Sequence, residues 1–269
     1  MLSQMFSYEF IQRAFIGGVL VSLCAALLGV SLVLKRYSMI GDGLSHVSFG
    51  ALSIAVACGF APMKFAIPVV IVAAFLLLRL AENGRMRSDA AIAMVSASAL
   101  AIGVIVTSVT TGLSTDVYSY MFGSILAMSK EDVTISVCLC VVVIIMFLFC
   151  YHRIFAVTFD ESFSKATGVK VGMYNTLISV FTAVTVVIGI KMMGAMLISS
   201  LIIFPALTSM RIFKSFLSVT ICSAILAVIN FTIGLICSYA FSIPAGASIV
   251  VVNLAVFILF SLVAVVKKR

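Results

Sequence analysis

The chain is a succession of long apolar stretches separated by short polar segments. A helix needs about 20 consecutive apolar residues to cross the hydrocarbon core of a bilayer. Stretches that approach or exceed this length lie at about residues 14–34, 44–60, 65–80, 90–110, 133–151, 174–190, 192–210, 216–240 and 245–266. A shorter and more polar segment, about 113–129, favours a re-entrant or half-helix, because such backbone is tolerated in a membrane where protein covers it.

The pattern predicts an all-α fold. We expect a polytopic transmembrane helical bundle with about eight to nine spans plus a short or re-entrant helix. A single transmembrane domain should cover residues 1–269. Composition agrees, since 64% of the residues are hydrophobic and 10% are charged, against about 45–50% and 25% in soluble domains. This excludes a soluble enzyme, a disordered chain and a nucleic-acid binder, because a soluble fold of this length cannot bury so much apolar surface.

The net charge of +8 gives an orientation. Membrane proteins carry an excess of Lys and Arg in their cytoplasmic loops. A nine-span topology with a cytoplasmic C-terminus places all the strongly basic segments on one side. These are Lys35/Arg36, Arg79/Arg85/Arg87, the segment 152–170, Arg211/Lys214 and the cluster 267–269. The charge therefore indicates the cytoplasmic face of a bilayer protein and says nothing about the substrate.

Asp42 and His46 are ionisable residues at the start of a predicted span, and their position there requires an explanation. They stand in Gly41-Asp42-Gly43-Leu44-Ser45-His46, and in a helix their i, i+4 spacing puts both on one face. A carboxylate and an imidazole could ligate one divalent cation, and this donor set suits zinc, manganese or iron. The alternative is that Asp42 caps the helix start and bonds His46. Ionisable residues near spans usually face the protein interior and mark pathways, which favours the metal interpretation.

Two ligands from one chain are too few for a tight site. A two-fold dimer would bring two Asp and two His together and supply four ligands, so a second copy of the chain is an expected partner. Few ligands and a proton-sensitive His suit transient binding. We therefore expect a site that holds a divalent cation only transiently, and no permanently bound cofactor.

The longest cytoplasmic connection, about residues 158–170, predicts a short amphipathic helix. An Asp-Glu pair stands at the end that the helix dipole favours for acids, an aromatic residue and an alanine share one face, and a glycine ends the segment. The residues concerned are Asp160, Glu161, Phe163, Lys165, Ala166 and Gly168. Such a helix offers a docking surface for another protein, or alternatively lies among lipid headgroups.

The sequence resembles the membrane subunits of bacterial zinc/manganese ATP-binding-cassette (ABC) importers. Four elements carry the resemblance, and together they run from about residue 10 to 262. They are Gly41-Asp42-Gly43-Leu44-Ser45-His46, Phe159-Asp160-Glu161 through Ala166-Thr167-Gly168-Val169, Gly194-Ala195-Met196-Leu197-Ile198-Ser199-Ser200 through Phe204-Pro205-Ala206, and Pro244-Ala245-Gly246-Ala247. The first two in combination are specific, whereas the last two alone are weak.

The resemblance implies a permease of the bacterial plasma membrane that works as a dimer with two cytoplasmic ABC ATPase subunits. An extracytoplasmic metal-binding protein would deliver zinc, slightly favoured, or manganese or iron. Asp42 and His46 carry over as metal-coordinating residues, and Asp160 to Gly168 as the ATPase contact. Gly194, Pro205, Pro244 and Gly246 carry over as sites of helix kinking or packing.

Several features qualify this assignment. The chain has no Gly-rich Lys-Ser/Thr phosphate loop, so ATP should act only through the partner subunit and the chain is not itself an enzyme. Many family members have a Leu-Pro-Gly where Phe49-Gly50-Ala51 stands here. The helix should therefore be straighter near His46, and the choice of metal stays open.

Two other functions compete. A permease for a larger chelate, such as a siderophore or cobalamin, should lack an intramembrane Asp/His pair and use a wider, aromatic-lined path. An intramembrane metallohydrolase needs three protein ligands and a catalytic acid or base. The only two histidines, His46 and His152, lie far apart in the sequence, and the second stands beside Arg153, which disfavours the hydrolase.

Overall fold

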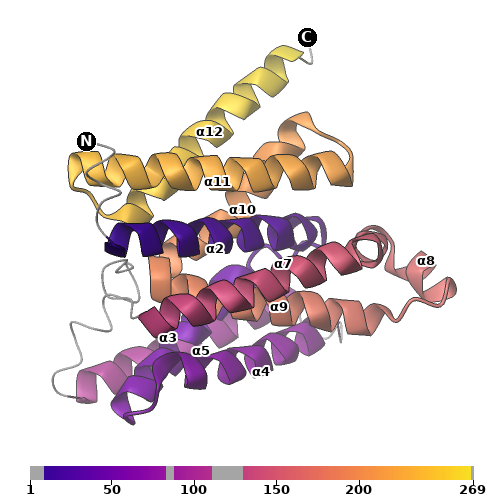
Figure 1. Cartoon of the computed structure of the whole chain (residues 1–269). Helices are drawn as coiled ribbons and strands as arrows, with labels where there is room; N and C mark the ends of the chain where they lie inside the picture. Colours follow the sequence, from indigo (N-terminus) through magenta and orange to yellow (C-terminus); the bar gives the residue numbers. More distant parts are fainter. Residues whose placement is uncertain (1–8, 83–87, 111–129, 268–269) are drawn as a thin grey trace.

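The computed structural model describes residues 9–82, 88–110 and 130–267, and within these ranges it contains helices and no β-strand. Figure 1 shows the helices as a bundle, with the short α8 at one end beyond α7 and α9. The helices are α2 (Glu9–Leu34), α3 (Ile40–Ala57), α4 (Pro62–Glu82), α5 (Ser88–Val109), α7 (Lys130–Phe159), α8 (Glu161–Ala166), α9 (Val171–Met193), α10 (Ala195–Ile212), α11 (Phe216–Phe241) and α12 (Ala245–Lys267).

Eight of these helices are long and apolar enough to cross a membrane: α2, α3, α5, α7 and α9 to α12. The apolar part of α4, Pro62–Leu77, is shorter. The predicted all-α bundle of about eight to nine spans is confirmed. The proposed re-entrant segment 113–129 and the basic residues Arg85 and Arg87 lie outside the described residues.

The helices divide into a buried centre and an apolar periphery. Most of α2, α3 and α9 is buried, whereas less than a quarter of the membrane-spanning stretch of α5, α7 and α12 is buried. Figure 1 shows the C-terminal part of α12 projecting beyond its neighbours. Exposed apolar helix surface of this extent suits contact with lipid or with other membrane segments.

Two glycines allow neighbouring helices to approach each other closely. A Cβ at Gly29 of α2 would collide with the backbone oxygen of Ile202 in α10. A Cβ at Gly50 of α3 would lie 2.7 Å from the backbone oxygen of Ala99 in α5. The absent side chains let the backbones come together, as is common in membrane bundles. α3 is thereby packed closely against α5.

The four predicted kink or packing residues have different local settings. Gly194 is the only residue between α9 and α10, and its φ of 87° suits a residue without a Cβ. Pro205 lies within α10. Pro244 directly precedes α12, and its carbonyl accepts a hydrogen bond from the Ser248 N–H at 3.1 Å, so this proline begins a helix. Gly246 is buried in the first turn of α12.

Candidate metal centre and cytoplasmic coupling segment

α3 places Asp42 and His46 on one face, as their spacing predicts. The helix begins at Ile40 and continues without interruption through Phe49-Gly50-Ala51, in agreement with the missing proline. Met39 occupies the N-cap position, and no side chain caps this helix end. Asp42 lies in the first turn, where the helix dipole favours a carboxylate. The alternative role of Asp42 as the capping residue is therefore not observed.

The two ionisable side chains lie near each other without a short mutual bond. His46 Nε2 is 3.7 Å from Asp42 Oδ2, and the side chains are 27% and 42% exposed, respectively. The Ser199 hydroxyl of α10 donates to Asp42 Oδ1 at 3.3 Å. A distance of 3.7 Å is too long for a hydrogen bond. Asp42 and His46 therefore each keep an atom that could coordinate a cation.

Asp42 and His46 line two neighbouring cavities of about 90 and 330 Å³. The smaller cavity extends to Met196 of α10, and the larger one to Ser96 of α5. Among the described residues that line the two cavities, Asp42 and His46 are the only ionisable ones. Both volumes exceed the roughly 30 Å³ that one water takes in the liquid. The pair thus lies where a hydrated cation fits.

The described residues contain no group of three or more His, Cys, Asp and Glu side chains that could hold a metal. His152 is exposed near the end of α7, far along the chain from Asp42 and His46. Within the described ranges, Asp42 and His46 therefore form a pair without a third side chain of these types beside them.

α8 has the start and the stop that the sequence predicts. Asp160 is its N-cap and accepts a hydrogen bond from the Phe163 N–H at 2.8 Å. Gly168 has a φ of 81°, and its N–H donates to the Lys165 carbonyl at 3.1 Å. The N–H of the next residue, Val169, donates to the Ser164 carbonyl at 2.9 Å. This pair of bonds is the Schellman motif, which commonly ends a helix at a glycine.

The outward face of α8 is partly aromatic. Phe163 is 64% exposed, and Phe159, which precedes the helix, is 58% exposed. Lys165 and Ala166 are also exposed, whereas Ser164 is buried. An aromatic and basic surface of this kind is available to a partner or to headgroups.

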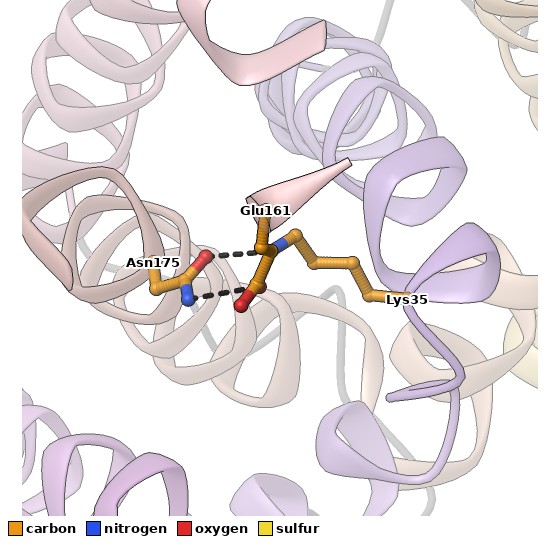
Figure 2. Close-up of polar contacts among 3 residues, drawn as sticks. All are labelled: Lys35, Glu161 and Asn175. Atoms are coloured by element: carbon orange, nitrogen blue, oxygen red, sulfur yellow. Dashed lines mark hydrogen bonds and ion pairs between the residues drawn. The ribbon is translucent and has the colours of Figure 1, made fainter. Parts of the chain in front are cut away.

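The start of α8 is held by polar contacts with the turn after α2 and with α9 (Figure 2). The Lys35 ammonium lies 2.7 Å from Glu161 Oε1 and donates to Asn175 Oδ1 at 2.5 Å. The Asn175 Nδ2 group donates to the same Glu161 oxygen at 3.1 Å. Lys35 directly follows α2, and Asn175 lies in the first turns of α9. The contacts put the segment 35–39 and α8 at one end of the bundle, as the predicted topology requires.

These contacts also set the ionisation of Glu161. Partial burial raises its pKa, but the hydrogen bonds from Lys35 and Asn175 and the positive charges of Lys35 and Lys165 outweigh burial. The net effect lowers the pKa of Glu161 below its usual value. The carboxylate is therefore ionised at neutral pH and carries the charge that the buried ammonium needs.

Two members of this cluster were missed in the sequence. Lys35 served there only as a topology signal, and Asn175 lies inside an apolar run without a flanking charge. A polar amide near the cytoplasmic start of a predicted span is the signal that could have drawn attention to Asn175.

The fold defines a polytopic α-helical membrane protein. More specifically, the chain belongs to the ABC 3 transport family, whose family model matches residues 7–264. The family resemblance found in the sequence is thereby confirmed.

Curated relatives cover almost the whole chain. A Treponema pallidum protein named "Probable metal transport system membrane protein" is 30% identical over 95% of this chain and 96% of its own length. The manganese import system permease protein ScaB of Streptococcus gordonii is 27% identical over 96% of this chain and 92% of its own. The high-affinity zinc uptake system membrane protein ZnuB of Haemophilus influenzae is 24% identical, covering 94% and 97%.

A solved structure has the same fold. It is PsaBC from Streptococcus pneumoniae in complex with Fab, with a TM-score of 0.86 and 27% sequence identity. The match covers 97% of this chain and 95% of that chain. The two chains therefore share the helix arrangement described above.

Proposed function

We propose that this chain is the membrane-spanning subunit of an ABC importer that moves a divalent metal cation, zinc or manganese, across the bacterial plasma membrane. The observation that carries the proposal is the Asp42–His46 pair in an otherwise non-ionisable cavity lining. Relatives named for manganese import and for zinc uptake support it. These relatives give no preference between the two metals, so the slight preference for zinc from sequence is not carried forward.

The energy source is a separate ATPase subunit. The sequence lacks a Gly-rich phosphate loop, and α8 offers Phe163, Lys165 and Ala166 on its exposed face. We expect the ATPase to dock there, and an extracytoplasmic binding protein to deliver the cation on the other side. A second copy of the chain would supply another Asp42 and His46 and complete a four-ligand set.

Transport requires binding that is reversible. At 3.7 Å, Asp42 and His46 do not satisfy each other, and two ligands per chain bind a cation less tightly than a closed structural site does. Movement of α8 by the ATPase would rock the spans and change which side of the membrane reaches the pair. Weak, exposed ligation then allows the ion to leave.

The test is metal-resolved uptake, measured by elemental mass spectrometry in cells with and without the chain. His46→Ala should abolish uptake while the ATPase subunit still co-purifies with the chain. His152→Ala is the matched control, since this exposed histidine lies near the C-terminal end of α7 and lines neither cavity. Normal uptake by the His46→Ala chain would overturn the assignment. Competition by metal chelates, with no effect of free cations, would favour the chelate permease instead.

A further inference from the structure

We propose that Lys35, Glu161 and Asn175 form a latch that positions α8 against the turn before α3, the helix that carries Asp42 and His46. In this view the three residues transmit the movement of α8 to Asp42 and are separate from the surface that docks the ATPase. The inference rests on the proposed function and adds positioning residues to it.

The latch is built around a buried charge. The Lys35 side chain is 6% exposed, whereas Glu161 is 44% exposed. Burying an ammonium is costly unless it is paired and hydrogen-bonded. Glu161 and Asn175 provide both, and they are 126 and 140 residues away along the chain. Because Asn175 bonds to both charged groups, the three side chains close a ring (Figure 2).

A short turn with its own backbone hydrogen bonds joins the latch to α3, which carries Asp42 and His46. α2 ends at Leu34, Lys35 follows, and α3 begins at Ile40. Within the turn, the Tyr37 N–H donates to the Leu32 carbonyl at 2.8 Å and the Ile40 N–H to the Tyr37 carbonyl at 3.0 Å. A turn bonded in this way transfers a displacement of Lys35 to the first turn of α3. Asp42 lies in that first turn.

The two faces of α8 therefore have different tasks. Phe163 and Lys165 face outward and are exposed. Asp160 caps the helix, and the Glu161 carboxylate bonds to Lys35 and Asn175 of the same chain. The resemblance assigns Asp160 and Glu161 to the ATPase contact. Because their carboxylates bond within the chain, we assign them instead to shaping and holding α8, and we leave the ATPase contact to the outward residues. Docking and transmission should thus be separable by mutation.

The experiment uses the chain assembled with its ATPase and binding protein in liposomes. It measures the ATPase subunit that co-purifies, ATP hydrolysed, and manganese or zinc ions imported per ATP. The variants are Glu161→Ala, Lys35→Met and the charge exchange K35E/E161K. Lys214→Met is the matched control, because this lysine is exposed in the turn between α10 and α11.

Both single variants should keep the ATPase bound and hydrolysing, with ions imported per ATP reduced roughly fivefold or more, the scale of ordinary site-to-site coupling. The charge exchange should recover much of the loss, since the Asn175 amide can donate to a carboxylate at position 35 and accept from an ammonium at 161. Lys214→Met should behave as wild type.

Other outcomes separate the two proposals. Unchanged ions per ATP in both single variants would overturn the latch. A fall in ATPase binding, hydrolysis and import in equal proportion would also overturn it, because that result means a purely structural role. A charge exchange that stays as uncoupled as the single variants would exclude the ion pair as the linking element. Absence of metal import by the wild-type assembly would instead overturn the proposed function.

Discussion

The Asp42–His46 pair and the Lys35–Glu161–Asn175 latch are two polar clusters in a chain with few charges, and they are built in opposite ways. The first pair is separated by 3.7 Å, and both side chains are partly exposed. The second cluster has contacts of 2.5 to 3.1 Å around an ammonium that is almost fully buried. Each arrangement has a physical consequence for what the cluster can do.

A group that must bind and release a cargo ion cannot be saturated by its own neighbours. A group that must hold two helices together has to be saturated, since a buried charge without partners destabilises the fold. Substitution should therefore affect transport and stability in different proportions at the two clusters. The predictions below test this difference.

The largest effect is expected from Asp42→Asn, which keeps the shape and removes the charge. Metal import should fall at least about tenfold, because loss of groups that merely support a metal ligand already costs about 10–100-fold. The free energy of unfolding should change by less than about 1 kcal/mol, as for other exposed pairs. Uptake and thermal unfolding of the purified chain at a fixed scan rate measure the two quantities. A large loss of stability with normal uptake would reverse the comparison.

Next, Glu161→Ala should destabilise the chain more than Lys35→Met does. The first substitution leaves a buried ammonium without its carboxylate, at a cost of about 1–3 kcal/mol. The second leaves a half-exposed carboxylate that water can solvate, and its apolar side chain suits the buried position. Midpoints of thermal unfolding in one detergent give the comparison. Equal midpoints for the two variants would mean that the burial difference has no energetic effect.

A smaller change is expected from Ser199→Ala, which removes the 3.3 Å hydrogen bond to Asp42. A bond of this length is at the weak end of the range, so the metal concentration for half-maximal uptake should change by roughly two- to threefold. Ser200→Ala is the control, because the Ser200 hydroxyl donates to the backbone carbonyl of Leu197. An equal shift in both variants would show a general effect on α10.

The smallest effect concerns acid. The pKa of Glu161 is lowered in the folded chain, so its charge stabilises the latch fully above the unfolded pKa. This stabilisation is lost as the pH falls through the lowered folded pKa. The difference in unfolding midpoint between wild type and Glu161→Gln should stay constant from neutral pH down to the usual value of 4.5 and shrink below it. A difference that grows below this pH would contradict the ionised latch.

The structural features that depend on residues close together in the chain could be predicted from the sequence. Apolar run length predicts the helices, the i, i+4 spacing predicts that Asp42 and His46 share a face, and cap chemistry predicts both ends of α8. The latch depends on contacts between segments more than a hundred residues apart. Lys35 and Asn175 could not be paired from one sequence, because nothing local to either residue specifies its partner. Met39 at the N-cap of α3 could not be predicted either, because its side chain makes no capping hydrogen bond that a sequence pattern could indicate.

The exposed aromatic surface of α8 has a consequence for how the cell supplies this subunit. Phe159 and Phe163 present large apolar rings at the end of the bundle where Lys35 meets α8. Until a partner covers them, such rings attract chaperones, proteases or other unassembled copies. Copies synthesised in excess of the ATPase should therefore be short-lived, so that the abundance of the partner sets how much of this chain accumulates.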